Sequence, residues 1–225
     1  MPPFLSIIIP VFNGEKYLAD AIKSVIKQNY KHKEIIVIDD GSVDQTANIA
    51  QEFQDVKYFF QSNQTVAVAR NTGIRESLGE WVTFLDHDDQ MTSDSIQSRI
   101  EYIQQYPQTN CLISQHISFM TPGIDRPDWI QQKRINTPQY GFGYLMARKS
   151  HLEKIGGYDP EYNIVENMEM FFRMKDIGVQ IDFFPRVVIH RRIHEKNVSQ
   201  QTNIARLNLL KMASKSIQRQ QSETD

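Results

Sequence analysis

The sequence predicts an α/β domain, with a doubly wound, mostly parallel sheet and helices on both of its faces. Over residues 5–85, short apolar runs alternate with segments whose apolar residues recur at helical spacing, and this alternation is typical of parallel strands joined by crossover helices. The first run, Leu5–Val11, is nearly continuous, which favours a strand buried on both faces. Acidic clusters follow two later runs, at the edge where such sheets bind ligands.

Strands and helices are expected to alternate over residues 1–90. The expected strands are Leu5–Val11, Ile35–Ile38, Val56–Phe60 and Trp81–Leu85, and the expected helices run from Leu18 to Ile26, from about Asp44 onward, and from Val66 to Leu78. Apolar residues of the first helix form one stripe that can pack on the sheet. Asp44 is placed to cap the first turn of the second helix.

The second half of the chain has a less regular pattern. We expect helices near residues 93–105 and 165–176, and strands near 111–117, 142–147 and 183–190. A long loop with prolines at positions 122, 127 and 138 separates the first two of these strands. Because long loops in compact domains are usually functional, we expect this loop to bind a substrate.

Length and composition favour one domain over residues 1–200, followed by a tail. The 225 residues suffice for one sizeable core, and the formal charge of −2 predicts no general attraction to nucleic acid. The single cysteine, Cys111, cannot form an internal disulfide. With no signal-like N-terminus and no apolar stretch long enough to span a bilayer, we expect a cytoplasmic protein.

Residues 201–225 are expected to form an amphipathic helix and a polar end. A helical projection places Leu207, Leu209, Leu210, Ala213 and Ile217 on one side, and Lys211, Lys215 and Arg219 roughly opposite. Two arrangements fit this pattern. The helix packs its apolar side on its own domain, or it lies on an anionic membrane near a lipid-linked substrate, peripheral to the inner face.

Asp86, Asp88 and Asp89 follow the fourth expected strand on one short turn. Carboxylates so close together repel one another unless a cation neutralises them. Magnesium or manganese suits that need and leaves coordination positions open for a substrate diphosphate. The alternative is a solvated turn whose aspartates cap the next helix.

Asp39 and Asp40 end the second expected strand, and the Gly41-Ser42 pair after them permits a tight turn. A carboxylate here is suited to accept a hydrogen bond from a nucleobase or ribose, or to cap the following helix. Arg70, on the third expected helix, suits phosphate oxygens or an ion pair. Neither glycine-rich phosphate loop is present, which disfavours a dinucleotide dehydrogenase and a P-loop enzyme.

Several segments together resemble the motifs of family 2 glycosyltransferases. They are Ser6–Asn13, Val37–Asp44, Ala69–Ile74, Phe84–Asp89, Ile155–Asp159 and Val165–Arg173. The resemblance covers about residues 4–200. It implies the GT-A fold, with a nucleotide-binding half at about 1–90 and an acceptor half at about 91–200. It also implies inverting transfer from a nucleotide-diphosphate sugar, foremost a UDP-sugar, to a glycan or lipid-linked acceptor in polysaccharide or glycoconjugate biosynthesis.

The resemblance also implies roles for individual residues. Pro10, Val11, Phe12, Asn13 and Asp40 would hold the nucleoside, Arg70 would lie near the base or diphosphate, and Arg192 would belong to a basic segment closing over the diphosphate. Asp88 would coordinate manganese or magnesium, Asp86 would touch the ribose or the metal, and His194 is a candidate third ligand. In the long loop, Trp129 is suited to stack on an acceptor sugar or to anchor the loop by burial.

One position departs from the family pattern. The family's Glu-Asp pair usually supplies an aspartate that takes the acceptor's proton, but this chain has Glu166 and Asn167 there. An amide cannot accept that proton. The base would then be Glu166 or Glu169, which lie about one helical turn apart, and we favour Glu166; otherwise the chain is slow or inactive.

Two other functions stay open at this point. A degenerate relative that binds nucleotide sugars without turnover would explain Asn167. A nucleotidyltransferase also binds a nucleotide and metal at strand ends, but it normally has a glycine- and arginine-rich loop after its first strand, which is absent here. A dehalogenase-type phosphatase fits poorly, because its aspartate pair follows the first strand and not the fourth.

Overall fold

The computed structural model describes residues 2–127, 130–162, 164–195, 197, 208 and 211. The strands are β1 (Leu5–Val11), β2 (Lys33–Asp39), β3 (Val56–Phe60), β4 (Trp81–Phe84), β5 (Gln90–Met91), β6 (Cys111–Met120), β7 (Gln139–Arg148) and β8 (Ile181–Ile193). The helices are α1 (Leu18–Ile26), α2 (Thr46–Gln51), α3 (Val66–Glu76), α4 (Ser95–Gln105), η1 (Gln132–Arg134), α5 (Lys149–Lys154) and α6 (Glu166–Asp176).

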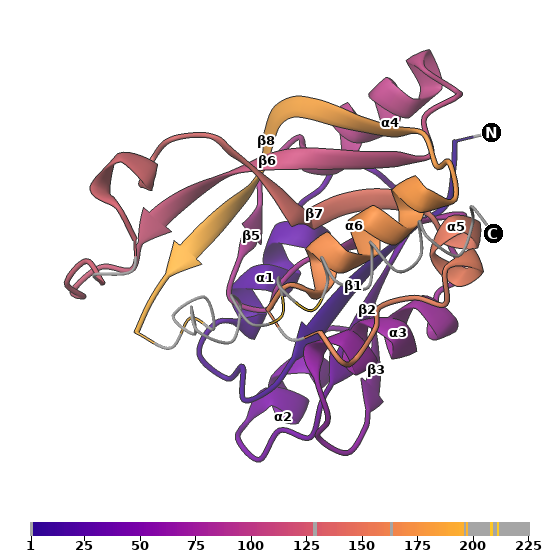
Figure 1. Cartoon of the computed structure of the whole chain (residues 1–225). Helices are drawn as coiled ribbons and strands as arrows, with labels where there is room; N and C mark the ends of the chain where they lie inside the picture. Colours follow the sequence, from indigo (N-terminus) through magenta and orange to yellow (C-terminus); the bar gives the residue numbers. More distant parts are fainter. Residues whose placement is uncertain are drawn as a thin grey trace.

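All eight strands form one sheet in the order β3-β2-β1-β4-β7-β6-β8-β5, and helices cover both of its faces (Figure 1). Strand β1 pairs in parallel with β2 and β4, and β2 pairs in parallel with β3. Every residue of β1 is buried, as expected for a strand between parallel neighbours. The prediction of an α/β domain with a mostly parallel sheet is confirmed.

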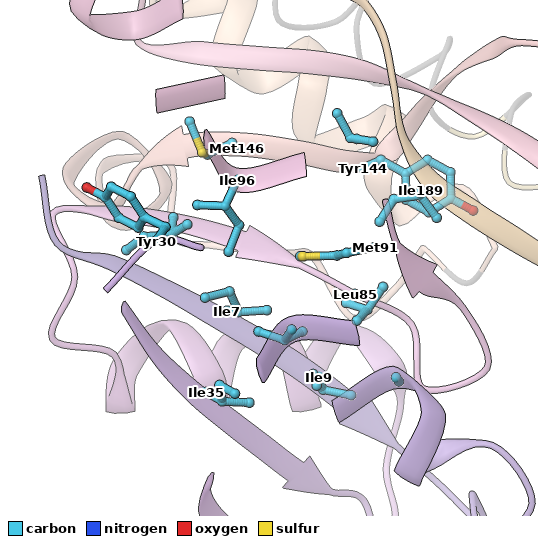
Figure 2. Close-up of a cluster of buried hydrophobic side chains, with 14 of the residues drawn as sticks. Ile7, Ile9, Tyr30, Ile35, Leu85, Met91, Ile96, Tyr144, Met146 and Ile189 are labelled. Carbon is cyan, nitrogen blue, oxygen red and sulfur yellow. The ribbon is translucent and has the colours of Figure 1, made fainter. Parts of the chain in front are cut away.

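Alternate side chains of β1 enter different layers of the core. Ile7 and Ile9 belong to a cluster with residues of α1 and α4, whereas Ile8 belongs to a second cluster with residues of α3, α5 and α6. Figure 2 shows the first cluster, in which side chains from β1 lie with Leu85 and Met91. Because side chains alternate across a strand, the sheet buries apolar groups on both faces.

The second half of the sheet mixes directions. Strand β7 is antiparallel to β4 and β6, while β6 and β8 are parallel and the short β5 is antiparallel to β8. Strands β6, β7 and β8 are longer than predicted. Their additional residues are largely polar or half-exposed, so no apolar run marks them. The extension of β8 carries Arg192 beside the loop that follows β4, because Arg192 accompanies Phe119 in register and bonds that loop.

Two helices differ from the prediction in a physically simple way. Helix α5 was not predicted, since its six residues bury only Leu152 and so have no periodic pattern. Helix α2 begins at Thr46 and not at Asp44. Asp44 precedes it, and its Oδ1 accepts a hydrogen bond from the Thr46 N–H (3.0 Å), so this aspartate still satisfies a donor at the helix start.

Two sequence predictions cannot be compared with the structure. Trp129 and most of the tail, including Leu207, Leu210 and Ile217, lie outside the described residues. Within the part that is described, no helix combines the length and apolarity required to cross a bilayer.

Candidate active site

The acidic turn lies between β4 and β5, at the carboxyl end of β4. The Asp89 N–H donates to the Asp86 carbonyl (3.0 Å), which closes the turn. The three carboxylates differ in exposure: the Asp86 side chain is 39% exposed, the Asp88 side chain 16%, and Asp89 is buried. The three aspartates lie close together in the sequence, but in the structure each carboxylate lies in a different environment.

Asp89 anchors the turn to the sheet. Its Oδ1 accepts from the Arg192 backbone N–H (2.8 Å), and its Oδ2 accepts from the Tyr144 hydroxyl (3.0 Å). Burial, and then the neighbouring charges of Asp88 and Asp86, raise the pKa of Asp89 well above its usual range. Asp89 thus fixes the loop against β7 and β8, and it does not face solvent.

Asp88 meets His194 across 106 residues of sequence. The Asp88 Oδ2 lies 2.8 Å from the His194 Nε2, and the Asn197 Nδ2 donates to the same oxygen (3.3 Å). Burial alone would raise the pKa of Asp88, but the hydrogen bond with His194 and the nearby His87 outweigh it and lower that pKa. The structure brings together two of the three residues that the sequence proposes as metal ligands.

Asp86 is held by Arg70. The Arg70 Nη2 donates to the Asp86 Oδ1 (2.9 Å), and its Nη1 donates to the Glu166 Oε1 (2.7 Å). Burial opposes the charge on Arg70, but the adjacent carboxylates raise its pKa above its ordinary value. The Arg70 side chain is only 3% exposed. Arg70 thus forms two ion pairs, with Asp86 and with Glu166, and its expected place near the base or diphosphate stays a prediction.

The start of helix α6 holds the three candidate catalytic residues. The Asn167 Nδ2 donates to the Glu166 Oε1 (3.1 Å), and the Asn167 Oδ1 accepts from the Tyr158 hydroxyl (3.3 Å). Glu169 accepts from the Arg173 Nε with both oxygens (2.8 Å each). Both glutamates are bound by arginine, and Asn167 is bound by neutral and anionic neighbours.

Arg192 ties the last strand to the first helix. Its Nε donates to the Asp88 carbonyl (3.0 Å), and its Nη2 bonds Asp20 on α1 (3.1 Å). The guanidinium lies over the rings of Tyr17 (4.6 Å) and Phe119 (5.1 Å). Arg192 is buried in this position, so its observed contacts support the acidic turn.

The ends of β1 and β2 interlock through their loops. The Asn13 N–H donates to the Ser42 Oγ (2.8 Å), and the Asn13 Oδ1 accepts from the Val43 N–H (3.0 Å). Pro10 and Val11 are buried within β1, whereas the Phe12 side chain points to solvent with 47% exposure. The two loops thus form one unit at the edge of the sheet.

Asp40 lies in that unit, and it is also buried. The Gln61 Nε2 donates to its Oδ1 (2.7 Å), and the Gln64 N–H is shared between its two oxygens (3.1 and 3.2 Å). Burial is the main cause that raises the pKa of Asp40. The Asp39 carboxylate has separate partners, the Ser42 N–H and the Tyr58 hydroxyl (2.8 Å each). Of these two carboxylates, it is that of Asp40 that bonds the loop after β3.

Comparison with known proteins identifies the family. Residues 6–195 match the model described as glycosyl transferase family 2. The chain belongs to this family. An uncharacterized glycosyltransferase of Rickettsia typhi is 30% identical over 218 residues, covering 90% of this chain and 67% of that protein. The family resemblance seen in the sequence is confirmed, and the homologues' names support a glycosyltransferase enzyme.

A second relative is the Campylobacter jejuni GalNAc(5)-diNAcBac-PP-undecaprenol beta-1,3-glucosyltransferase. It is 34% identical over 165 residues, which covers 67% of this family 2 chain and 53% of that protein. The chain spans a still smaller share, 17%, of the Streptococcus pneumoniae glycosyltransferase GlyA, at 36% identity over 119 residues and 51% of this chain. Several relatives are thus much longer than this chain.

Solved structures share the fold at low identity. The mannosyltransferase PcManGT of Pyrobaculum calidifontis, in complex with GDP-Man and Mn2+, has a TM-score of 0.74 at 18% identity, covering 97% of this chain and 65% of that chain. S. aureus TarS in complex with UDP-GlcNAc has a TM-score of 0.72 at 19% identity, covering 92% and 66%. These likenesses establish the GT-A fold for this family 2 chain.

The donor chemistry of the acidic turn fits a divalent metal. Asp88 and His194 present a carboxylate and an imidazole to each other, and both ligand types suit manganese. The half-exposed Asp86 carboxylate uses Oδ1 for Arg70. Among the described residues, no three His, Cys, Asp or Glu side chains are already gathered as a metal cluster; Asp86 and the substrate diphosphate are the candidates for further ligands.

Sequence reasoning missed the residues that support these groups. Tyr144, labelled in Figure 2, bonds Asp89 from β7, and Tyr158 bonds Asn167. Arg173 binds Glu169 and also donates to the carbonyl of Gly157 (2.7 Å). Buried aromatic and arginine residues are read from sequence as core or surface groups, so no local signal pointed to these contacts.

Proposed function

We propose that the chain transfers a sugar from a nucleotide-diphosphate sugar to an acceptor hydroxyl, with a divalent metal and with inversion at the anomeric carbon. One observation carries most of this proposal: Asp88 and His194 meet at 2.8 Å beside Asp86, at the carboxyl end of a strand in a mostly parallel sheet. Ligands bind at that edge in open α/β sheets.

Different residues would bind the nucleoside and the metal. The loops at the ends of β1 and β2, with Phe12, Asn13 and Asp40, would hold the nucleoside. Asp88 and His194, with Asp86 beside them, would hold manganese or magnesium. The metal, when bound, supplies a Lewis acid that stabilises charge on the departing diphosphate. Tyr144 and Arg192 keep the turn in place through Asp89.

Uridine and guanosine diphosphate sugars are the donors to test first, because fold neighbours were solved with UDP-GlcNAc and with GDP-Man. We place UDP-sugars foremost. For the acceptor, we propose a glycan or a lipid-linked glycan, since the Campylobacter jejuni relative carries an undecaprenol-linked substrate in its name. A lipid-linked acceptor would bring the protein to the inner face of the membrane as a peripheral contact.

Binding of nucleotide with and without metal tests the proposal directly. UDP and GDP, each with Mn²⁺, should raise the melting temperature, because a ligand that binds the native state shifts the unfolding equilibrium. Excess chelator should remove most of the shift. Equal shifts with chelator and with Mn²⁺ would exclude metal-assisted binding. No shift with either nucleotide would count against the proposed donor class.

A catalytically degenerate binding protein is the second candidate, and Asn167 is the observation that favours it. Neither Asn167 nor the doubly bound Glu169 offers a free carboxylate at the start of α6. Release of UDP from a UDP-sugar library, with water as acceptor, separates the candidates without a known acceptor. Metal-dependent donor hydrolysis supports the enzyme, whereas tight binding without any turnover supports the degenerate relative.

A further inference from the structure

A buried ion-pair chain joins the acidic turn to helix α6. Arg70 stands in the middle, with Asp86 on one side (2.9 Å) and Glu166 on the other (2.7 Å). The side chains of Arg70 and Glu166 are 3% and 5% exposed, whereas that of Asp86 is 39% exposed. Of these three residues, only Asp86 offers a substantial surface to a ligand.

Glu166 is closed off from an acceptor in this arrangement. Its Oε1 binds both Arg70 and the Asn167 amide, and its Oε2 is buried with no hydrogen-bond partner among the residues that the structure describes. A general base must come within hydrogen-bond distance of the proton that it takes. Neither oxygen of Glu166 meets that condition, although its charge acts directly on Arg70.

Arg70 is well suited to transmit that charge. A guanidinium is planar and presents its donors in a fixed fork, so anchoring one branch orients the other. Glu166 holds Nη1, and Nη2 is thereby aimed at the Asp86 Oδ1. The ring of Tyr158 packs against the guanidinium at 5.3 Å and limits its rotation. The second oxygen of Asp86 is left for a ligand.

We propose that Glu166 is a positioning residue of the donor site, which fixes Asp86 through Arg70 and does not take the acceptor's proton. This inference rests on the proposed function, since it assigns Asp86 to the bound nucleotide sugar and metal. It gives α6, a helix of the expected acceptor half, a role in donor binding. It also replaces the general-base role that the sequence suggests for Glu166.

The same helix supplies a matched control. Glu169 lies one turn from Glu166, is equally buried, and pairs with Arg173 at 2.7 Å. Arg173 donates onward to the carbonyls of Ile155 and Gly157, and within the described part of the chain no bond links it to the acidic turn. Removing either glutamate's charge breaks a buried ion pair, but only Glu166 is connected to Asp86.

The experiment compares Glu166→Gln with Glu169→Gln by calorimetric titration of UDP and GDP in the presence of Mn²⁺. We expect Glu166→Gln to weaken nucleotide binding by about tenfold, the scale typical of groups that orient a metal ligand. Glu169→Gln should stay within about twofold of the wild type, although both variants should melt at lower temperature. In the Asp86→Asn background, Glu166→Gln should cause no further loss of affinity.

Each contrary result has a distinct meaning. Unchanged nucleotide affinity in Glu166→Gln, with donor turnover lost, would overturn the inference and restore Glu166 as the base. An equal loss of affinity in both glutamine variants, or a further loss in the Asp86→Asn background, would also overturn it. If Glu166→Gln does not fold, Arg70→Lys, which keeps the charge without the fork, should show the same loss of affinity. A wild type that binds neither nucleotide would refute the proposed function, and this inference with it.

Discussion

The two halves of the sheet bury polar groups in different ways. In the first half, β1 is buried along its whole length, and polar side chains gather in the loops beyond the strand ends. In the second half, β6 buries Ser114, His116 and Ser118 within the strand itself, and each has a side-chain atom with no hydrogen-bond partner among the described residues. The strands of the first half also bury polar side chains, such as Ser6 on β1 and Glu34 on β2, but these two bond each other. The two halves therefore differ in how their buried polar groups are paired.

This difference indicates where substitutions should act. Groups at the edge of the first half contact solvent and can meet a ligand, so changes there should alter nucleotide binding more than stability. Groups buried in the second half cost free energy to bury, so changes there should alter stability or its pH dependence. Helix α6 is the exception, because its first turn reaches the acidic turn through Arg70.

The largest expected effect comes from Asn167→Asp. A carboxylate at this position restores a group able to take the acceptor's proton, and a positioned general base typically contributes about 10²–10⁴-fold to the rate. Nearby Arg70 offsets the added negative charge beside Glu166. We expect faster sugar transfer, or faster donor hydrolysis where no acceptor is known, with nucleotide affinity nearly unchanged.

Asn167→Ala is the control, because it removes the same amide without adding a base. It should not accelerate turnover. If Asn167→Asp folds, binds nucleotide and turns over no faster than the wild type, the proton acceptor lies elsewhere than at the start of α6.

The second prediction concerns Asp88→Ala. Loss of this carboxylate removes the partner of His194, so Mn²⁺ should no longer enhance UDP or GDP binding, with an affinity loss of roughly 100-fold at saturating metal. The melting temperature without ligand should change little by comparison. Titration calorimetry measures the nucleotide affinity with and without Mn²⁺, and thermal unfolding measures the melting temperature. A variant that retains the full metal enhancement would remove Asp88 from the metal site.

Much of the first half could be predicted from sequence. The bounds of β1, β3 and α1 match the prediction, and β2, β4 and α3 lie within a few residues of it, because apolar runs and helical spacing are local signals. Asp88 and His194 were expected near each other through family resemblance, as candidate ligands of one metal; they do lie together, and their role as ligands stays a prediction. Nothing in the local sequence indicates that residues 106 positions apart would meet.

The second half and the ion pairs could not be predicted in the same way. The ends of β6 and β8 are polar, and their pairing depends on contacts between distant segments. From sequence alone, Arg70 was suited to phosphate oxygens or to an ion pair with an unidentified partner. Its partner Glu166 is 96 residues away in the sequence. Sequence patterns indicate which face of a helix or strand is apolar, but they do not indicate which buried charges form ion pairs.

The third prediction uses the pH dependence of stability. Burial, and then the charge of Arg191, lower the pKa of His116 from 6.5 to about 4. Below pH 6.5, His116 binds a proton in the unfolded chain but not in the folded chain, so the free energy of unfolding decreases as the pH falls toward 4. The loss attributable to His116 is at most about 3 kcal/mol.

Urea unfolding at pH 7, 5.5 and 4 measures this contribution. His116→Gln, which cannot titrate, should lose less stability on acidification than the wild type. His32→Gln removes an exposed histidine and should retain the wild-type loss. Parallel pH profiles for His116→Gln and wild type would show that His116 accepts its proton equally well in the folded protein.

The smallest expected effect is that of replacing Arg99, which lies on the opposite face of the sheet from the buried Arg70. Arg99 on α4 is as buried as Arg70, yet it donates to neutral groups: the Ser95 carbonyl and hydroxyl and the Thr83 hydroxyl. Burial lowers the pKa of Arg99 to about 9.

Replacing a buried charge by an apolar side chain of similar size is often neutral or stabilising. Arg99→Met should therefore change the free energy of unfolding by no more than about 1 kcal/mol, because the lost hydrogen bonds offset the relief of desolvation. Arg70→Met should instead destabilise by roughly 3–5 kcal/mol, because it leaves the buried Glu166 carboxylate without its counter-ion. Urea unfolding at pH 7 compares the two variants, and equal losses would mean that the carboxylates around Arg70 add nothing to the stability of the fold.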